Sequence, residues 1–288
     1  MAIWNLGSIN ADYVYSVPHL PKPGETLAST KRQVFLGGKG TNMSVAAARA
    51  AARVHHIGAV GTDGRWAVER LLEYGVDTRQ IAEVDVETAQ AIIAVDDHGE
   101  NSIILHSGAN QAIPSSLIEA ALSQASTSDW FVCQNETNQQ RYAMELAKKM
   151  GLKTAYAAAP FEIESVEAVL PFVDFLILNE VEMSQLQDAT GQSAKDLGVE
   201  IVIVTKGSEG SVLYSNGEEQ TVPAFDVEVV DTTGAGDTFT GYVLAGLDRG
   251  MPLKQAVDMA TKAGALMVMR HGTADVIPDL LEVQNFAP

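Results

Sequence analysis

Cysteine is almost absent from this sequence: Cys133 is the single one among 288 residues. A disulfide within the chain is therefore impossible, and metal or redox sites built from paired cysteines are excluded. Cys133 lies in the apolar run DWFVCQ. We interpret it as a buried structural thiol.

Basic residues are also scarce, because 19 Lys and Arg face 37 Asp and Glu, which gives a formal net charge of −18. Such an acidic chain is a poor partner for nucleic acid or for an anionic membrane surface, and we expect neither. A phosphorylated ligand stays compatible with this charge, since a local nest of backbone N–H groups can bind phosphate inside an acidic protein.

Long hydrophobic runs are missing as well. No segment approaches the roughly 18 uninterrupted apolar residues that a membrane helix needs. The first residues, MAIWNLGSINADY, lack the basic and apolar regions of a secretory signal. We therefore expect a cytoplasmic protein. Its 46% hydrophobic composition suffices for a large core, and we predict one domain over residues 1–288.

Apolar runs of strand length alternate with helix-period segments through most of the chain. The runs lie at 54–61, 129–134, 173–179 and 200–207, and amphipathic segments follow the first three of them. This alternation predicts an α/β fold, with a doubly wound, mostly parallel sheet and helices on both faces. Such sheets bind their ligands at the carboxyl ends of the strands.

Residues 12–36 and 87–108 break the alternation. Short strand-like pieces follow one another there with little helical pattern between them, and DDHGEN at 96–101 is typical of a hairpin turn. We predict that these two segments form a small antiparallel sheet, which projects from the α/β body as a lid.

The first glycine-rich turn is DTTGAGDTF at 231–239, between a predicted strand at 225–230 and a predicted helix. Its glycines would bring backbone N–H groups to a helix N-terminus, where unpaired donors and the helix dipole bind anions. It is not a P-loop, because no Lys-Ser/Thr follows the glycines. It is not a dinucleotide fingerprint either, because Phe239 stands at the third glycine position. Read alone, Asp237 could equally be a helix cap.

Phosphoryl transfer to an alcohol explains why a carboxylate lies beside an anion site. The N–H groups of Gly234, Ala235 and Gly236 would hold the transferring phosphate, and Asp237 would accept the proton of the hydroxyl as a general base. A carboxylate of low pKa is adequate, because the proton leaves late in a loose transition state.

The second glycine-rich turn is FLGGKGTN, again between a predicted strand and a predicted helix. Gly38 permits a close approach of the backbone to a ligand, and Lys39 and Asn42 can hydrogen-bond one. Met43 stands at the third glycine position, so this turn also fails the dinucleotide pattern. A tight structural turn is an equally good explanation of the segment alone.

Asn10 and Asp12 follow the first predicted strand in the segment GSINADY. Alternate residues of an extended chain share a face, so the two side chains could point into one pocket. An amide and a carboxylate make a suitable pair for vicinal hydroxyls. An ordinary Asx turn is the local alternative.

Two further strand ends carry polar residues. Asn179 and Glu182 have the spacing of a capping box. Alternatively, Asn179 binds phosphate and Glu182 organises the waters of Mg²⁺, and the two interpretations do not exclude each other. Thr205, Gly207 and Gly210 follow a buried strand, which suits a nucleotide lying across the strand end or a hairpin turn.

Together these segments resemble the ribokinase-like (PfkB) family of carbohydrate kinases. DTTGAGDTF resembles the C-terminal signature of the family, and GGKGTN resembles its N-terminal glycine motif. The order fits over nearly the whole chain: GSINAD, PGET, GGKGTN, GAVGTDG, HSGAN, NEVE, TKGSEG and DTTGAGD.

The resemblance implies transfer of the γ-phosphoryl group of ATP to the primary hydroxyl of a sugar, with Mg²⁺. D-ribose is the leading acceptor; 2-deoxyribose, fructose, a sugar phosphate and a nucleoside are the alternatives. A non-catalytic regulator that binds sugar or ATP ranks lower, because a pure binder does not need the carboxylate of GAGD. The implied lid often pairs with the lid of another subunit, so we expect a homodimer.

The resemblance also assigns roles to individual residues. Asp237 is the expected catalytic base, and Gly234, Ala235 and Gly236 are the expected anion hole. The residues expected to bind the sugar are Asn10, Asp12, Gly38, Lys39, Asn42, Glu136 and Asp237. The residues expected at the nucleotide and its Mg²⁺ are Asn179, Glu182, Thr205, Gly207, Gly210 and Gly236.

The family pattern further implies a monovalent cation, usually K⁺, beside the anion hole. Two positions depart from the pattern: Val276 replaces a small polar residue, and Ala157 in AYAAAP replaces an amide. The second departure weakens the assignment to ribose and leaves the family assignment intact. The positions that match the two cation-binding segments are Asp231, Thr233, Arg270 and Gly272.

Overall fold

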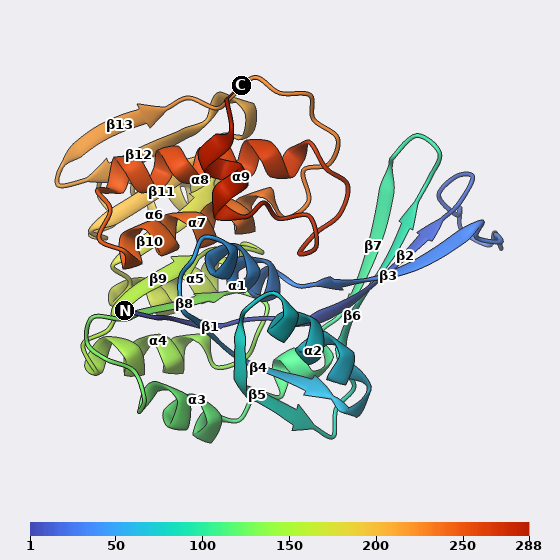
Figure 1. Ribbon diagram of the computed structural model, residues 1–288, viewed down its shortest axis with the longest axis horizontal. Helices are drawn as coiled ribbons and strands as arrows, with labels where there is room; N and C mark the ends of the chain where they lie inside the picture. The colour runs from blue at the N-terminus through green and yellow to red at the C-terminus, as the bar shows by residue number, and fades with distance from the viewer. Residues whose placement is uncertain (288) are drawn as a thin grey trace.

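A nine-stranded sheet forms the centre of the computed structural model, which describes residues 1–287 (Figure 1). Neighbouring strands from β11 to β5 pair in parallel, and β12 and β13 add two antiparallel strands at one edge. The predicted mostly parallel sheet is confirmed. In spatial order the strands are β13 (Glu218–Val222), β12 (Ser211–Ser215), β11 (Ile201–Thr205), β10 (Phe175–Asn179), β9 (Lys153–Ala157), β8 (Trp130–Gln134), β1 (Ile3–Leu6), β4 (Val54–Gly61) and β5 (Asp77–Val84).

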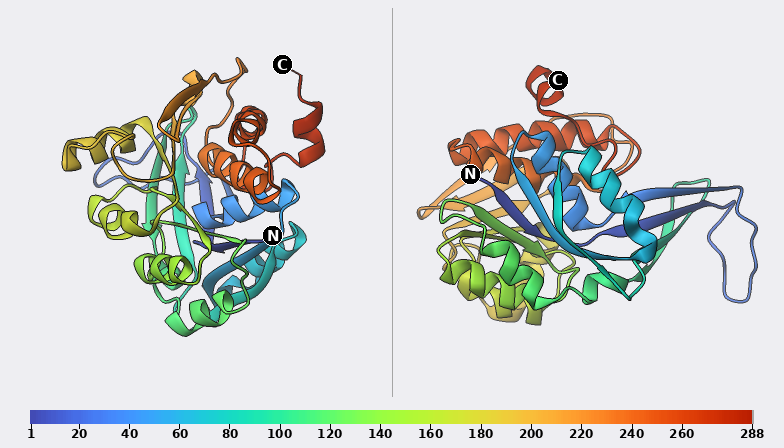
Figure 2. Two further views of the ribbon diagram at one scale, coloured as in Figure 1. Left: turned by 90° about the vertical axis from the view of Figure 1, so that its left-hand side faces the viewer. Right: turned by 60° about the horizontal axis from the view of Figure 1, so that its bottom comes forward.

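Helices cover both faces of the sheet, and each face has its own hydrophobic core (Figure 2). None of the described helices has the length and apolar character needed to span a bilayer. One face carries α1 (Lys39–Arg49), α2 (Arg65–Glu73), α7 (Ala235–Asp248), α8 (Leu253–Val268) and α9 (Leu280–Asn285). The other carries α3 (Ser115–Leu122), α4 (Gln140–Lys149), α5 (Ile163–Val169) and α6 (Glu180–Thr190).

The central strands are apolar on both faces because both faces are covered. In β8, Trp130 and Val132 belong to one core, and Phe131 and Cys133 belong to the other. This alternation follows from the two-residue period of a strand. A strand buried on both faces therefore appears in the sequence as a continuous apolar run. Cys133 is a buried free thiol, as predicted.

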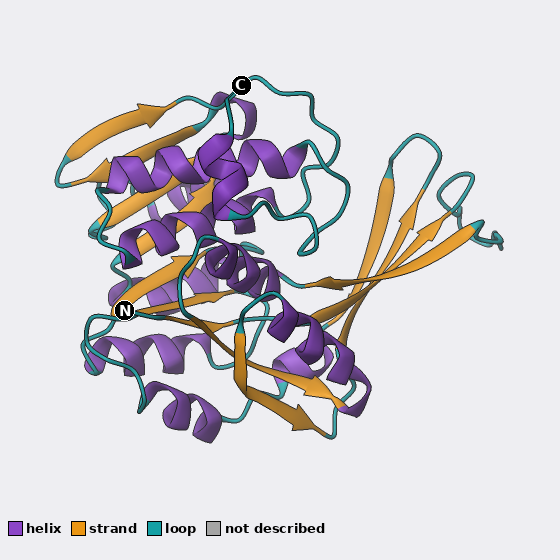
Figure 3. Ribbon diagram, in the orientation of Figure 1, coloured by secondary structure: helices purple, strands orange, loops and turns teal. Residues whose placement is uncertain are grey.

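A second sheet projects from the body (Figures 1 and 3). Its four strands confirm the strand-like pieces predicted in the two lid segments. The predicted antiparallel pairing is wrong at the centre, where β2 and β6 pair in parallel. Both strands run outward from the body as the first strand of a hairpin, so their directions agree. In spatial order the strands are β3 (Lys31–Gly37), β2 (Asn10–Ser16), β6 (Ala89–Val95) and β7 (Asn101–His106).

The strand predicted at 225–230 does not form. Residues 223–229 have no regular secondary structure, and Val229 and Val230 are exposed. The N–H groups of Val230 and Asp231 both donate to the carbonyl of Val268, at the end of α8. The segment has the alternating pattern of a strand, but its end hydrogen-bonds to the end of α8 and no strand pairs with it.

A chain of buried polar side chains lies beneath the GGKG turn. Asn5 Nδ2 donates to the Gly40 carbonyl and to Ser44 Oγ, each over 2.8 Å. Ser44 Oγ lies 2.8 Å from His56 Nδ1, and His56 Nε2 lies 3.1 Å from the carbonyl of Gly7. Because a carbonyl only accepts, Nε2 carries a proton, and in the neutral ring Nδ1 then accepts from Ser44. The contacts therefore specify the tautomer of the neutral imidazole.

This neutral imidazole makes stability depend on pH. Burial lowers the pKa of His56 from 6.5 to about 4. As the pH falls below 6.5, His56 becomes protonated in the unfolded chain but stays neutral in the folded chain. The free energy of unfolding therefore decreases. We expect His56 to account for a loss of about 3 kcal/mol between pH 6.5 and pH 4.

Urea unfolding at both pH values measures this loss. His56→Gln removes the titrating group, so the difference between the two pH values should shrink by that amount. His98→Gln changes an exposed histidine and should keep the full difference. An unchanged difference in His56→Gln would contradict the prediction.

Candidate active site

The candidate site residues gather at the carboxyl edge of the central sheet. The strand order changes direction at β1: β4 and β5 extend the sheet on one side, and β8 to β11 extend it on the other. Open α/β sheets bind ligands outside the strand ends at such a switch point. The segments that follow β1, β8, β10 and β11 carry the residues predicted from the sequence.

A single hydrogen bond joins the two glycine-rich turns, whose residues stand 195 positions apart. Asn42 Nδ2 donates to Asp237 Oδ2 over 2.9 Å. Asn42 lies in the first turn of α1 and Asp237 in the first turn of α7, and these two helices pack in the same core. Both side chains are buried. The two motifs therefore form one site.

Gly234 shapes the nest of donors ahead of α7. Its φ of +73° is left-handed, and an added Cβ would lie 3.3 Å from Asn42 Nδ2, so another residue would be strained and would press on that amide. Within residues 1–287, the N–H groups of Gly234, Gly236 and Asp237 have no acceptor, whereas that of Ala235 donates to the Thr232 carbonyl over 3.2 Å. Three unpaired donors remain for an anion.

Lys39 lies among three carboxylates. The charge of Asp237 contributes most to raising the pKa of Lys39; burial opposes the rise, and Glu136 and Glu182 add to it. Burial raises the pKa of Asp237, against the effects of Lys39 and of the hydrogen bond from Asn42. Burial also raises the pKa of Glu182. The single ammonium thus offsets part of the cost of burying these acids.

Asp12 and Glu136 form an acidic pair on the lid side of the site. Asp12 lies in β2, and Glu136 follows β8 and accepts from the Ser8 hydroxyl and, over 3.0 Å, from the Lys39 N–H. Burial, followed by the negative charge of Glu136, raises the pKa of Asp12 to about 7. Asn10 also lies in β2, which begins two residues before the predicted lid segment.

Asn179 and Glu182 form the capping box of α6. Asn179 Oδ1 accepts from the Glu182 N–H over 2.9 Å, and the Asn179 N–H donates to Glu182 Oε2 over 2.8 Å. Both residues also line a cavity of about 350 Å³, so the cap does not exclude a role in binding. The other polar or glycine positions on its wall are Lys39, Thr205, Thr232, Thr233, Gly234, Gly236, Asp237 and Thr240.

Gly207 and Gly210 do not line this cavity. An added Cβ on Gly210 would lie 2.1 Å from the carbonyl oxygen of Val222, so this glycine permits close packing against the end of β13. Thr205 is therefore the member of the predicted nucleotide-binding segment that the structure brings to the cavity.

The two predicted cation-binding segments lie together. Asp231 Oδ1 accepts from the Thr233 N–H over 2.9 Å, and Oδ2 accepts from the Gly272 N–H over 3.4 Å. The Arg270 guanidinium donates to the Val276 carbonyl and to a carboxylate of α9. Because a guanidinium is itself positive and has no acceptor, only the main chain of Arg270 can contact a cation. Within residues 1–287, no three His, Cys, Asp or Glu side chains cluster as metal ligands.

Sequence reasoning missed two residues of the site. Ser8 Oγ donates to Glu136 and accepts from the Gly40 N–H over 3.1 Å. Asn110 Nδ2 donates to Asn10 Oδ1 over 2.8 Å. Both lie in the motifs GSINAD and HSGAN, so the signal was present, but their partners stand far away in the sequence.

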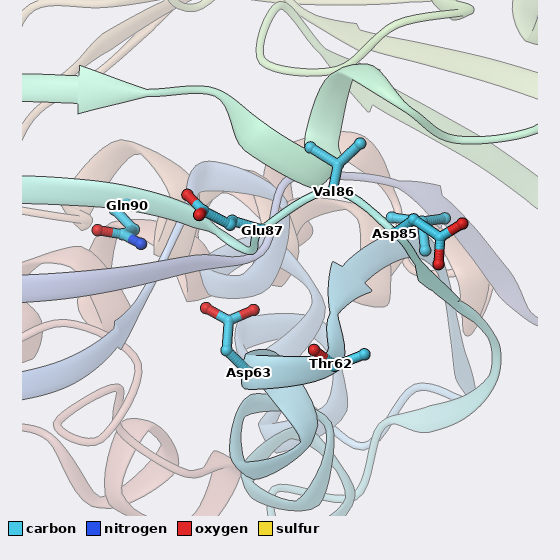
Figure 4. A pocket seen from close by; sticks show the side chains of 7 residues that line it. Thr62, Asp63, Asp85, Val86, Glu87 and Gln90 are labelled. Carbon is cyan, nitrogen blue, oxygen red and sulfur yellow. The ribbon is translucent and has the colours of Figure 1, made fainter.

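A second hollow, of about 310 Å³, lies at the root of the lid and has an acidic lining (Figure 4). The Asp63 carboxylate there accepts from the N–H and the hydroxyl of Thr88. It thereby ties the segment before β6 to the end of β4. The labelled side chains include Asp85 and Glu87 and no cation, which makes this hollow unsuitable for a phosphate.

Comparisons with known proteins agree with this geometry. The model of the pfkB family of carbohydrate kinases matches residues 3–280. The chain belongs to this family. Its members are phosphotransferases that act on a hydroxyl group of a sugar. The predicted fold class and enzyme class are confirmed.

Individual relatives match over nearly their full length. A ribokinase of Haemophilus influenzae is 36% identical, with 98% of this chain and 96% of the relative covered. A deoxyribokinase of Salmonella typhi is 30% identical, with 99% and 98% covered. The structure of Arabidopsis thaliana ribokinase complexed with ribose and ATP has a TM-score of 0.86 at 28% identity, and both chains are covered completely.

The raised pKa of Asp12 is directly measurable. We expect its carboxyl carbon, assigned with the Asp12→Asn variant, to titrate near pH 7 in ¹³C NMR. Because the folded chain then holds a proton that the unfolded chain has lost, this group lowers the free energy of unfolding as the pH rises from 3.8 to about 7.

Glu136→Gln removes the nearby negative charge, so Asp12 should titrate at lower pH in that variant. Glu145→Gln changes an exposed carboxylate of α4 and should leave the titration where it is. Titration of Asp12 near pH 4 in the parent would overturn the prediction.

Proposed function

We propose that this chain transfers the γ-phosphoryl group of ATP to the primary hydroxyl of D-ribose. The hydrogen bond between Asn42 and Asp237 carries the proposal, because it holds a buried carboxylate between a nest of N–H donors and the hydroxyl-binding side chains. The ribokinase relatives, one of them solved with ribose and ATP, support ribose as the acceptor.

Asp237 is proposed as the general base. Its buried position raises its pKa toward the working pH, which favours proton transfer from the hydroxyl. The unpaired N–H groups of Gly234, Gly236 and Asp237 hold the transferring phosphoryl group as its charge develops. The N–H group of Ala235, in the same turn, joins them if it leaves the Thr232 carbonyl. Lys39 supplies the nearby positive charge.

The sugar is proposed to lie between the two glycine turns and the base of the lid. Asn10, Asp12 and Glu136 supply polar contacts from the lid side, and Asn42 supplies one from α1. The Lys39 N–H is already used by Glu136, so the backbone at Gly38 and the Lys39 side chain complete the set.

ATP is proposed to lie along the carboxyl edge, with its phosphates at Asn179. Its nucleoside is proposed to pass Thr205 and to reach the turn of Gly207 and Gly210, which lies outside the lining of the cavity. Mg²⁺ fits this site only as an ion held mainly by phosphate oxygens and water, because the protein offers Glu182 and no metal-binding cluster among the described residues. The ion would neutralise phosphate charge there.

A monovalent cation fits beside the nest through main-chain carbonyls and the Asp231 carboxylate. The segments at Thr233 and Gly272 meet at this carboxylate. Arg270 can contribute only its carbonyl, because its guanidinium is positively charged and has no acceptor. We propose K⁺ as the ion that these two segments hold.

Release of ADP from ATP tests the function. Ribose should give the highest kcat/KM in a panel with 2-deoxyribose, fructose, ribose 5-phosphate and adenosine. Turnover should require Mg²⁺ and increase with K⁺. Inactivity on ribose beside strong activity on another acceptor would end the ribose assignment. Absence of ADP release with every acceptor would favour a regulator that only binds.

A substitution of Asp237 tests its proposed role as the general base. Asp237→Asn should lower kcat by about 10²- to 10⁴-fold, because the amide cannot accept the proton. The fold should persist, since the new side chain still offers an oxygen to Asn42. Asp258→Asn, on exposed α8 surface, is the matched control and should keep parental turnover. Near-parental kcat in Asp237→Asn would refute the role.

The lid is proposed to pair with the lid of a second copy. Large apolar side chains on β6 and β7 are 45–66% exposed, and Ile92 lies directly opposite Ile104 in the sheet. The strand β7 is also an edge strand with unpaired backbone groups. An exposed apolar edge of this kind favours association, and pairing would cover it.

Replacing Ile104 by Glu should convert a dimer to a monomer, because two charges would face each other in the covered surface. Light scattering after gel filtration measures the mass. Leu72→Glu, at an equally exposed apolar position on α2, should leave the dimer intact. A parent that is monomeric at tens of micromolar would contradict the proposal, as would a dimeric Ile104→Glu variant.

A further inference from the structure

Asn110 lies where the lid returns to the body. It belongs to the short helical turn η2 (Gly108–Gln111), which comes just after β7, and its side chain is only 2% exposed. Asn110 takes no part in the proposed phosphoryl transfer. Its side chain nevertheless contacts the start of β2, where the sugar-binding pair Asn10 and Asp12 lies.

The hydrogen bonds of Asn110 fix the direction of its amide. Its Oδ1 accepts from the N–H of Ile9 over 3.0 Å, and its Nδ2 donates to Asn10 Oδ1 over 2.8 Å. Because a backbone N–H only donates, the oxygen of Asn110 must face Ile9. The carbonyl of Asn110 accepts from the Asn138 N–H over 3.0 Å, which anchors the residue from a third side.

The direction of the Asn110 amide fixes that of Asn10 in turn. Since Asn10 Oδ1 is used by Asn110, the free group of Asn10 is its Nδ2, which has no partner among the described residues. Asp12, two residues further along β2, shares a face of the strand with Asn10 and offers an acceptor. A donor and an acceptor therefore stand side by side.

Such a pair complements two adjacent hydroxyls, of which one accepts and the other donates. If the Asn10 amide were reversed, its oxygen would stand beside the Asp12 carboxylate, and two acceptors would face the same diol. The contact from Asn110 disfavours that arrangement, because its Nδ2 would then face another N–H₂ group.

We propose that Asn110 is a positioning residue that sets the direction of the Asn10 amide and thereby selects acceptors with vicinal hydroxyls. The inference rests on the proposed function. Asn110 acts through Asn10 and does not touch the sugar. In a ribofuranose ring every vicinal pair of hydroxyls includes the one on C2, so 2-deoxyribose is the informative comparison.

Asn110→Asp tests the proposal with a change of a single group. The new side chain can still accept from the Ile9 N–H, but it cannot donate to Asn10, whose amide should turn its Nδ2 away from the sugar. We expect kcat/KM for ribose to fall about 10- to 100-fold, mainly through KM. The value for 2-deoxyribose should change less than threefold, so discrimination between the two sugars decreases.

Asn138→Asp is the matched control. Asn138 accepts from the N–H of Ile113 over 3.2 Å and donates to its carbonyl over 3.1 Å, so this variant also loses one donor next to the same turn. It has no side-chain contact with Asn10, and the ratio of kcat/KM values for the two sugars should stay parental even if thermal stability falls.

Asn10→Asp provides a second route to the same result, because it removes the donor and leaves Asn110 unchanged. Because Asn10 itself contacts the sugar, kcat/KM should fall for both sugars and fall more for ribose, even if Asn110→Asp does not fold. An active parent whose sugar ratio is unchanged in these variants would overturn the inference alone. A parent inactive on both sugars would overturn the proposed function and, with it, this inference.

Discussion

The site depends on the contact between the backbones of Gly7 and Gly40. A Cβ on Gly40 would come within 2.3 Å of Gly7 Cα, so neither chain could approach as closely with a side chain in between. Asn5 and its buried polar partners hold the two segments together from below. The first turn of α1 is thereby pressed against the end of β1. This places Lys39 and Asn42 at the switch point of the sheet.

The same contact between Gly7 and Gly40 also places the partners that stabilise the buried Asp237 carboxylate. Asp237 is buried, and burying a carboxylate is unfavourable unless it is paired and hydrogen-bonded. Lys39 and Asn42, both positioned by the start of α1, supply the charge and the hydrogen bond. Asn42 Oδ1 has no partner among the described residues, which is a further cost of holding its Nδ2 toward the carboxylate. The two large cores of the sheet offset these costs.

Much of this arrangement is readable from the sequence. Strands such as β8 are apolar on both faces, and the two glycine turns contain the residues that meet at Asp237. Strand pairing could not be predicted in the same way. Residues 225–230 have the alternating pattern of a strand, but they pair with no edge of either sheet. The parallel neighbours β2 and β6 depend on the direction in which two hairpins leave the body. Asn110 was missed because its partner Asn10 is 100 positions away.

The residues proposed for phosphoryl transfer and those proposed for selection of the sugar lie on different segments. Asp237 and the donor nest belong to α7 and the turn before it, and α7 packs against α1 and α8 in the core on one face of the sheet. Asn10, Asp12 and Asn110 belong instead to the segments by which the chain enters and leaves the lid. If the proposed roles hold, changes in the lid segments alter which hydroxyls are recognised without moving Asp237 or the donor nest. A fold arranged in this way can keep one phosphoryl-transfer chemistry while its acceptor changes, because the two proposed tasks share few residues: none of Asn10, Asp12 and Asn110 lines the cavity beside Asp237.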